Sequence, residues 1–455
     1  MSLMKAELRL ILRSKLAAAS LALLFALSAL AIWSGIANVR RADATIARVE
    51  AAQQQDFAQV AATYGKPDGE PGYAAYYTFL LTSDHPGPLA FAAIGQRDVQ
   101  PNVLRIRALG LQSQLYESET INAELALPGA FDFAFVAIYL APLVAIALAH
   151  DLVSGEREAG RLRLLLSIPG RAGAVWRRRA GLRYALVLAA LLLPLVAALL
   201  ALGSPLLGGL GMIAVASVYL AFWFALCLIL GARINASATS AAALVGCWIA
   251  LTLLLPTLAN AAIARAVPVA KGIDLTLAQR ELVHHGWDTP KAETFNAFLA
   301  THPQFRGKEA FAGRFHWKWY YAIHQAADQA VAPQVAEYRA SLAAREAWTQ
   351  RVGYVLPGVA AQVMLHRLAD TDLTAQLGYQ NSIAAFHARL RNFYYPYLFD
   401  ARPFTRADFD RLPVYQPRED TASWPAGSML ALLLAAAIGL GIAAVQVRRI
   451  GSAAG

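Results

Sequence analysis

Cysteine is nearly missing from this 455-residue chain, which contains only Cys227 and Cys247. Both lie inside apolar stretches, so the polar segments hold no cysteine at all. This scarcity excludes a disulfide framework and a cysteine-ligated zinc site from the polar segments. Both thiols are expected to be small residues packed among apolar neighbours.

Motifs that usually indicate chemistry are also missing. A phosphate-binding loop needs a glycine-rich stretch followed by Lys and then Ser or Thr, but the only Gly-Lys pairs begin at Gly65 and Gly307 and continue with Pro and Glu. Neither G-x-S-x-G nor H-E-x-x-H occurs. We therefore predict no catalytic, cofactor-binding or metal-binding residue, and no enzymatic activity in this chain alone.

Histidine spacing favours a structural role for these side chains. His316 and His324 would share one helical face but lie about 12 Å apart along its axis, too far for one ion without other ligands. We favour core or interface histidines over a metal site. The aromatic stretches 315–321 and 393–399 allow an apolar ligand surface, but a helical core or a belt at the membrane face is the preferred interpretation.

Charged residues are scarce as well, at 15% of the sequence against 57% hydrophobic residues and a mean hydropathy of +0.42. Such a composition is typical of a polytopic membrane protein. Six apolar segments of about 20 residues are long enough to cross a bilayer. We predict an all-α integral membrane protein with six transmembrane helices, an N-terminal interfacial helix, a cytoplasmic coupling helix and two extracytoplasmic excursions, of which the second is mostly helical.

The predicted domains follow the ends of the apolar segments. They are an interfacial helix with span 1 (1–37), a first extracytoplasmic domain (38–130), spans 2 to 5 (131–264) with the coupling helix at 151–176, a second extracytoplasmic helical domain (265–424), and span 6 with a cytoplasmic tail (425–455). Asp132 precedes span 2, where a carboxylate favours a helix N-terminus. Prolines 142, 194 and 256 lie within spans 2, 3 and 5.

The distribution of charge predicts the orientation. With both termini cytoplasmic, the inner segments contain fifteen basic and four acidic residues, whereas the outer segments are nearly neutral. The whole formal surplus of +10 therefore follows the positive-inside rule. Anionic lipid is a sufficient partner for it, and nucleic acid is not needed. The expected location is a bacterial inner membrane with a multi-pass chain.

The segment from His150 to Trp176 has a distinctive pattern. Five charged residues, from Glu156 to Arg163, lie within two helical turns, and Leu162, Leu165 and Leu166 share a face before Pro169 and Gly170. This spacing predicts a short amphipathic helix at a membrane face. A plain charged loop between two spans is the alternative.

This segment resembles the coupling helix of type-2 ABC transporter permease subunits, of the subgroup with large extracytoplasmic domains after spans 1 and 5. The matching residues are Ser154, Gly155, Glu156, Arg157, Glu158, Gly160, Leu162, Leu164, Leu165, Pro169 and Arg171. Arg161 departs from the pattern, since Thr is common there. The resemblance implies that an ABC ATPase subunit docks on this helix and holds ATP and Mg, and that a second permease copy completes a dimer.

The expected function is thus that of the membrane-spanning permease subunit of an ATP-driven exporter. Glu156 and Arg157 would lie at the ATPase contact, and the spans around the three prolines would change their packing. Two alternatives stay open: a mechanotransmission complex that acts on an outer partner without transport, and a membrane sensor or enzyme with a ligand-binding outer domain. The predicted spans offer no charged residues that would indicate a substrate pathway, because the ionisable residues gather at the span ends.

Overall fold

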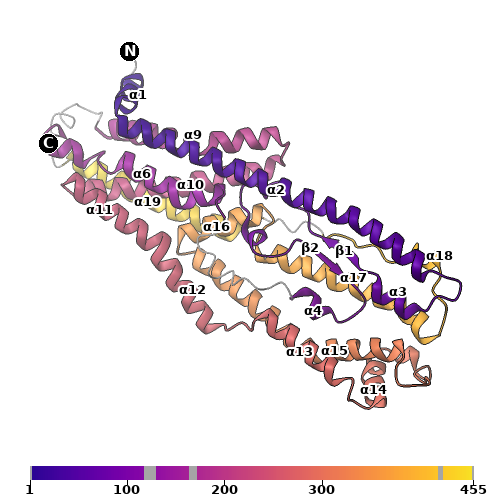
Figure 1. The fold of residues 1–455 in the computed structure, drawn as a ribbon. Coiled ribbons are helices and arrows are strands. Elements are labelled where there is room, and N and C mark those ends of the chain that lie inside the picture. The colour runs from indigo at the N-terminus through magenta and orange to yellow at the C-terminus, as the bar shows by residue number, and fades with distance from the viewer. Residues whose placement is uncertain (1–2, 117–129, 163–171, 419–423, 453–455) are drawn as a thin grey trace.

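The computed structural model describes residues 3–116, 130–162, 172–418 and 424–452. Its described part is mostly helical and contains six helices that are long and apolar enough to cross a membrane. We call these helices the bundle, and the mixed helical and strand region beyond them the head. Helix α1 (Leu3–Arg13) and the end of α19 (Ala426–Ser452) lie at the same end of the molecule, opposite the head (Figure 1).

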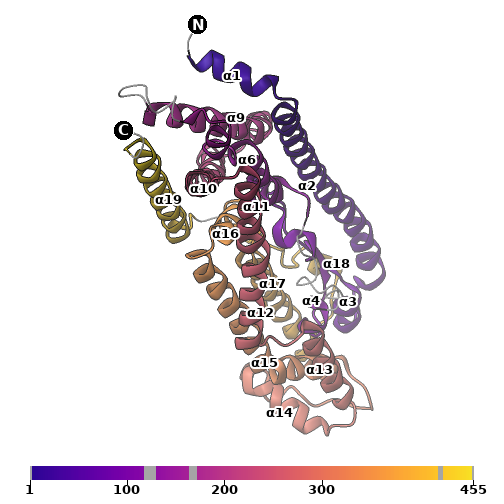
Figure 2. The same ribbon diagram turned by 90° about the vertical axis from the view of Figure 1, so that its left-hand side faces the viewer.

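Helix α2 (Lys15–Tyr64) is a single helix of 50 residues that belongs to both regions. At about 1.5 Å per residue it is roughly 75 Å long. It begins with Ser14 as N-cap, packs along α9 (Ala172–Ala201) in the bundle and continues into the head without a break (Figures 1 and 2). The predicted boundary at residue 37 therefore falls inside a continuous helix, because the residues after it are also good helix formers without Gly or Pro.

The remaining spans pack around α10 (Leu206–Arg233), which contacts α6 (Ala141–Ala149), α9, α16 (Pro357–Leu368) and α19. Span 2 comprises α5 (Phe133–Phe135), the π-helical segment η3 (Val136–Leu140) and α6 (Ala141–Ala149), and Asp132 caps it through a 2.8 Å bond from the Phe135 amide, as predicted. Span 3 is α9 (Ala172–Ala201). Span 5 comprises α11 (Ser237–Trp248), the π-helical segment η4 (Ile249–Leu254) and α12 (Leu255–Ala266).

The head combines both predicted excursions. The first contributes α3 (Pro71–Tyr77), β1 (Leu80–Ser83), η1 (Gly95–Asp98), β2 (Val103–Ile106) and α4 (Leu111–Leu115). β1 and β2 pair antiparallel, with Leu80 opposite Ile106. The second contributes α13 (Gly272–His285), α14 (Lys291–Thr301), η5 (Pro303–Phe305), α15 (Trp317–Gly353), α16 (Pro357–Leu368), α17 (Leu373–Phe399) and α18 (Arg406–Phe409). The prediction of a mostly helical second excursion is confirmed.

Two apolar clusters join these two excursions, which the sequence had divided into two domains. Ala74 of α3 and Ala108 pack in the same cluster as Phe298, Tyr321 and Tyr394 from the second excursion. The first excursion has too few large apolar residues to enclose a core alone, so it buries them against α15 and α17. The core interpretation is also confirmed for most of the aromatic stretches; their buried members are Trp317, Trp319, Tyr321, Tyr394, Tyr395 and Phe399.

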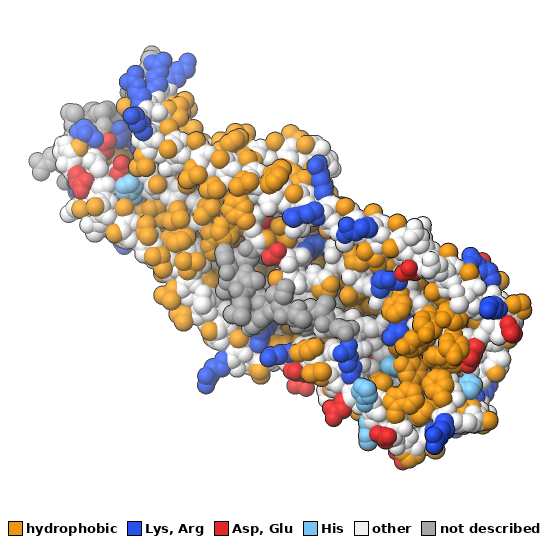
Figure 3. All heavy atoms as spheres, in the orientation of Figure 1, with side chains coloured by type: hydrophobic (Ala, Val, Ile, Leu, Met, Phe, Trp, Pro, Cys, Tyr) orange, Lys and Arg blue, Asp and Glu red, His pale blue; other side chains and the backbone are white. Residues whose placement is uncertain are grey.

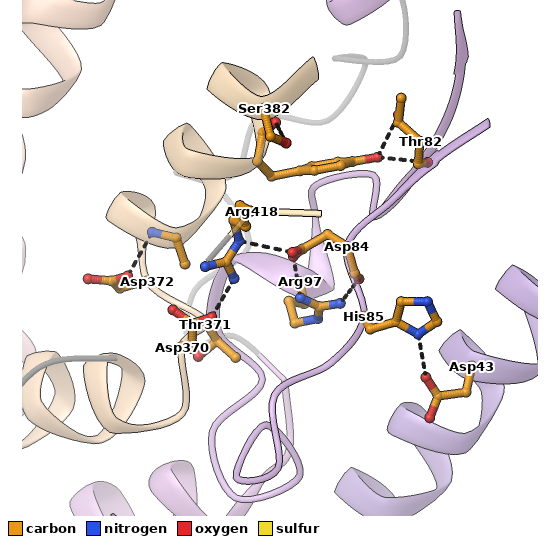
Figure 4. Close-up of polar contacts among 12 residues, drawn as sticks. Asp43, Thr82, Asp84, His85, Arg97, Asp370, Thr371, Asp372, Ser382 and Arg418 are labelled. Atoms are coloured by element: carbon orange, nitrogen blue, oxygen red, sulfur yellow. Dashed lines mark hydrogen bonds and ion pairs between the residues drawn. The ribbon is translucent and has the colours of Figure 1, made fainter. Parts of the chain in front are cut away.

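Four buried charged side chains form a network of ion pairs in the head (Figure 4). Asp84 accepts from Arg97 at 2.6 Å and from Arg418 at 2.9 Å, and Arg418 also pairs with Asp370. Each of these side chains is at most 10% exposed. Because the two carboxylates and two guanidiniums balance, the burial of each charge is compensated by its partners. The cluster ties the loops after β1 and α16 to the segment that leads into span 6.

Candidate functional site

The best-defined candidate site is the segment between spans 2 and 3, at the end of the bundle that also holds both chain ends (Figure 1). Helix α7 (Ser154–Glu158) lies within its described residues, which extend to Leu162. Gly160 follows with a φ of +68°, a backbone conformation that favours glycine and ends the helix. Of the predicted coupling residues, Leu164, Leu165, Pro169 and Arg171 lie outside the described residues.

Ser154 fixes α7 to the end of span 2. It is fully buried, and its Oγ donates to the His150 carbonyl at 3.1 Å. Ser240 of α11 donates to the same oxygen at 3.0 Å. A Cβ on Gly155 would stand 3.3 Å from the Asp151 Cβ, so the turn between span 2 and α7 is tight. These contacts join the start of α7 to both span 2 and span 5.

Arg157 and Glu158 bind the connection between α10 and α11. The guanidinium of Arg157 donates to the Ala232 and Ile234 carbonyls at 3.0 and 3.2 Å, and to Asn235 Oδ1 at 2.8 Å. A Glu158 carboxylate oxygen accepts from the Ser237 amide at 2.8 Å. A cation thus meets the C-terminus of α10 and an anion meets the N-terminus of α11, as the two helix dipoles favour.

Glu156 is the centre of a second set of contacts. Its carboxylate accepts from Arg161 and from Arg179 of α9, both at 2.8 Å. Arg179 also lies 3.4 Å from Glu7 of α1. Arg183 of α9 donates to the Leu148 carbonyl at the end of α6 at 2.8 Å. Glu156 therefore connects α7 to α9 through charge-assisted hydrogen bonds, and Arg179 extends this set to α1 through its ion pair with Glu7.

These contacts change the interpretation of the predicted partner surface. Glu156 and Arg157 both make hydrogen bonds within their own chain, so a partner that binds either side chain would have to share it with these internal contacts. The surface that α7 leaves open is formed by Glu158, Ala159, Gly160 and Arg161, all exposed. Leu162 is half-buried against the bundle core. The prediction that a partner binds this segment stays a prediction, now directed at residues 158–161.

The π-helical segment before Pro142 gives span 2 a second special feature. Proline has no amide hydrogen, so the carbonyl four residues earlier, that of Ile138, loses its usual helical partner. The Tyr219 hydroxyl of α10 donates to this carbonyl at 3.1 Å. The neighbouring Tyr139 carbonyl accepts from the Trp248 indole of α11 at 3.1 Å. Side chains from two other spans thus donate to backbone carbonyls of span 2.

Related irregularities occur near the other two prolines. The π-helical segment η4 precedes Pro256, and the Leu255 amide bonds back to Ala250, five residues earlier. In α9, the Leu191 carbonyl lies three residues before Pro194 and accepts from the buried Ser28 Oγ of α2 at 2.7 Å. Such π-bulges and proline sites are common places for helices to bend or shift.

The fold and this site describe a helical protein with six candidate membrane spans and one composite head. Residues 273–418 match the family model described as a domain of unknown function, DUF3526. The match runs from the start of α13 to Arg418 of the buried charge cluster, and so covers the helical part of the head but none of the spans. No curated protein and no solved structure matches the chain.

Sequence reasoning missed the internal partners of this site. It recognised the charges of α7 but did not assign them to the connector between α10 and α11. One signal was available in the sequence. Only three residues separate the C-terminus of α10 from the N-terminus of α11. A helix C-terminus favours a cation and a helix N-terminus favours an anion, which is the order of Arg157 and Glu158.

Proposed function

We propose that this chain is the membrane permease subunit of an ATP-driven exporter, with a separate ATPase subunit bound at residues 158–161. The observation that carries the proposal is the double capping by Arg157 and Glu158. A partner that displaces α7 must move α10 and α11 together or break these bonds. ATP and Mg would be held by that ATPase, and a second permease copy would complete the assembly. The excess of fifteen basic over four acidic residues in the inner segments supports a cytoplasmic location for this face.

The helices of the chain supply a path for such a displacement. From α11 it runs through η4 into α12, whose end is held to the head by Arg345 of α15, since its Nε donates to the Val267 carbonyl at 2.8 Å. Rearrangement at η3, η4 and Pro194 would then open a route between the spans. A helix that already contains a π-bulge can change its local hydrogen bonding at lower cost than a regular one.

The docking of the ATPase is tested best at Ala159, which is exposed and leaves the internal bonds of α7 intact when it is changed. We expect Ala159→Trp to reduce the amount of co-purified ATPase at least tenfold, whereas the control Ala159→Ser retains it. Melting of both variants should match the wild type. Normal ATPase recovery with Ala159→Trp would contradict the docking proposal.

The orientation has its own test. In a variant without Cys227 and Cys247, one cysteine is introduced at Ala159, directly after α7, and another at Ala332 of α15 in the head; both positions are exposed. A membrane-impermeant maleimide applied from outside should label residue 332 only. Outside labelling of residue 159 would reverse the proposed topology.

A mechanotransmission complex is the second candidate, and helix α2 favours it. This one helix connects the bundle to the far part of the head, so movement of span 1 would reach the head directly. Three glycines inserted after Arg41 would soften this connection. Mechanotransmission would be supported if the insertion abolishes movement of the head while ATP turnover stays undiminished, and if no cargo stimulates that turnover in proteoliposomes. Cargo-stimulated turnover would support the exporter.

A further inference from the structure

An exposed aromatic surface covers the end of the head that lies farthest from the chain termini (Figure 3). Tyr73, Tyr77, Trp287 and Phe315 are each 43–45% exposed. Tyr64 stacks on Tyr77 with ring centroids 5.1 Å apart, and further ring contacts link Tyr73 through Trp317 to Phe315 and Trp287. Single exposed aromatic residues are common, but a connected set at one end of a protein indicates a binding surface.

A pocket of about 430 Å³ adjoins this surface, and Tyr77 belongs to both. Asp56, Gln59 and Val60 form one wall, at helical spacing on one face of α2. Phe79 and Arg105 complete it, with the Arg105 guanidinium 5.3 Å from the centre of the Phe79 ring. Asp56 and Arg105 form an ion pair at 2.7 Å whose side chains are 49% and 39% exposed. The pocket volume suits a small ligand or one unit of a polymer.

The chemistry of this pocket favours a neutral ligand with hydroxyl groups. Its two charged groups neutralise each other, so the pocket has no net charge that would attract a charged ligand. Carboxylate, guanidinium and amide groups together supply both acceptors and donors. The aromatic rings next to them offer flat apolar faces with negative electrostatic potential, which attract the weakly positive C–H groups of a saturated ring. An equatorially substituted sugar has both features, a flat C–H face and a rim of hydroxyls.

Two other occupants fit less well. A proline-rich peptide needs slots between aromatic rings, but Tyr64 fills the space beside Tyr77 and also stacks on Tyr73 at 5.9 Å. A lipid bilayer is remote, because α3, which carries Tyr73 and Tyr77, lies at the end of the head away from the chain termini (Figure 1).

We propose that the pocket between α2, α3 and β2, with the adjoining tyrosines, binds a neutral β-linked oligosaccharide. The hydroxyl-rich rim of the sugar would meet Asp56, Gln59 and Arg105, while its C–H face would pack on Tyr77. This site would let the head recognise a glycan outside the bilayer. The inference does not depend on the proposed transport function, because binding needs only this chain.

The test uses the full chain in detergent, with cellohexaose and chitohexaose as neutral probes and decaproline as the competing ligand class. Calorimetry should detect binding of at least one hexasaccharide and none of decaproline. Tyr77→Ala should weaken binding at least tenfold, Tyr77→Phe should retain it within about threefold because the ring is kept, and Gln59→Ala should weaken it severalfold. Trp348→Ala removes an equally exposed aromatic ring from the other end of α15 and should change nothing.

The comparison requires that the melting temperature of Tyr77→Ala stays near the wild-type value. We expect this because the Tyr77 side chain is exposed. If it falls, Tyr77→Phe and Gln59→Ala decide the result by themselves. Binding of decaproline in place of both sugars, hexasaccharide binding that is unaffected by Tyr77→Ala and Gln59→Ala, or no binding of either hexasaccharide would each overturn the proposal.

Discussion

Arg157 and Glu158 are consecutive residues that bind the two sides of one helix junction. Arg157 Nη2 donates to the Ala232 carbonyl at 3.0 Å, and Glu158 Oε1 accepts from the Ser237 amide at 2.8 Å. The first contact caps the C-terminus of α10 and the second caps the N-terminus of α11. Two adjacent side chains of a five-residue helix therefore bind both sides of the junction between spans 4 and 5.

Removal of this guanidinium should loosen the junction. Arg157→Ala leaves the last carbonyls of α10 to solvent and removes a cation from its C-terminus, which should reduce the free energy of unfolding by about 1 kcal/mol. Arg157→Lys keeps the charge but loses the planar fork, so its effect should be smaller. Thermal unfolding in detergent measures both. A wild-type melting temperature for Arg157→Ala would show that the capping contacts contribute nothing.

The Tyr219 hydroxyl should be important because the residue four positions after its acceptor, Ile138, is Pro142, which has no amide hydrogen. Tyr219→Phe removes this hydroxyl donor from the Ile138 carbonyl beside Pro142, with an expected cost of about 1–3 kcal/mol. Tyr184→Phe is a matched control, since the Tyr184 hydroxyl donates at 2.9 Å to the Ser217 carbonyl within the regular helix α10. The control should cost less. Equal losses in the two variants would mean that the proline site needs no external donor.

The sequence predicted the spans well because apolar length is a local property. Six segments are recognisable without knowledge of their neighbours, and Asp132 is recognisable as a cap from its place before Phe133. It predicted domain limits poorly. Residues 38–64 carry polar side chains that look like an excursion, yet the backbone continues α2, because helix continuity depends on propensity and on packing against the head.

The position of the candidate site along the chain could be predicted from the sequence, but the residues that its side chains contact could not. Charge pattern located α7, whereas the partners of its charges, Arg179 and Asn235, are 23 and 78 residues away in the chain. The buried pair of Asp84 and Arg418 joins positions 334 residues apart. Such pairs depend on the tertiary fold, and no helical or strand period reveals them.

Arg418 should be essential for the stability of the head. Arg418→Gln leaves Asp84 with one partner fewer and Asp370 without this guanidinium, in a site where these carboxylates are at most 10% exposed. Breaking such a buried network by removing one partner typically costs about 3–5 kcal/mol. Arg411→Gln is the control, because Arg411 is 71% exposed and lies 3.6 Å from Asp408. Loss of stability should be seen by denaturant unfolding only for Arg418→Gln; similar unfolding curves for both would contradict the role of the cluster.

The head should also lose stability in mild acid because of His324. Its Nδ1 accepts from the Gly110 amide at 3.2 Å, and burial, aided by the charges of Arg391 and Arg107, lowers its pKa to about 3. The unfolded chain takes up a proton at a pKa of about 6.5, whereas the folded head does not until about pH 3. Stability is therefore full above about pH 6.5 and falls as the pH is lowered towards 3, by about 1.4 kcal/mol per pH unit for one such group.

Replacement of this histidine separates its contribution from that of other groups. His324→Asn keeps an acceptor for the Gly110 amide but cannot bind a proton, so its loss of stability between about pH 6 and pH 4.5 should be smaller than that of the wild type by about 1–2 kcal/mol. The control is His285→Asn, which changes an exposed residue at the end of α13 and should leave the wild-type slope unchanged. Denaturant unfolding followed by tryptophan fluorescence at a series of pH values measures the slopes. A His324→Asn slope equal to that of the wild type would mean that His324 takes up its proton in the folded head as readily as in the unfolded chain.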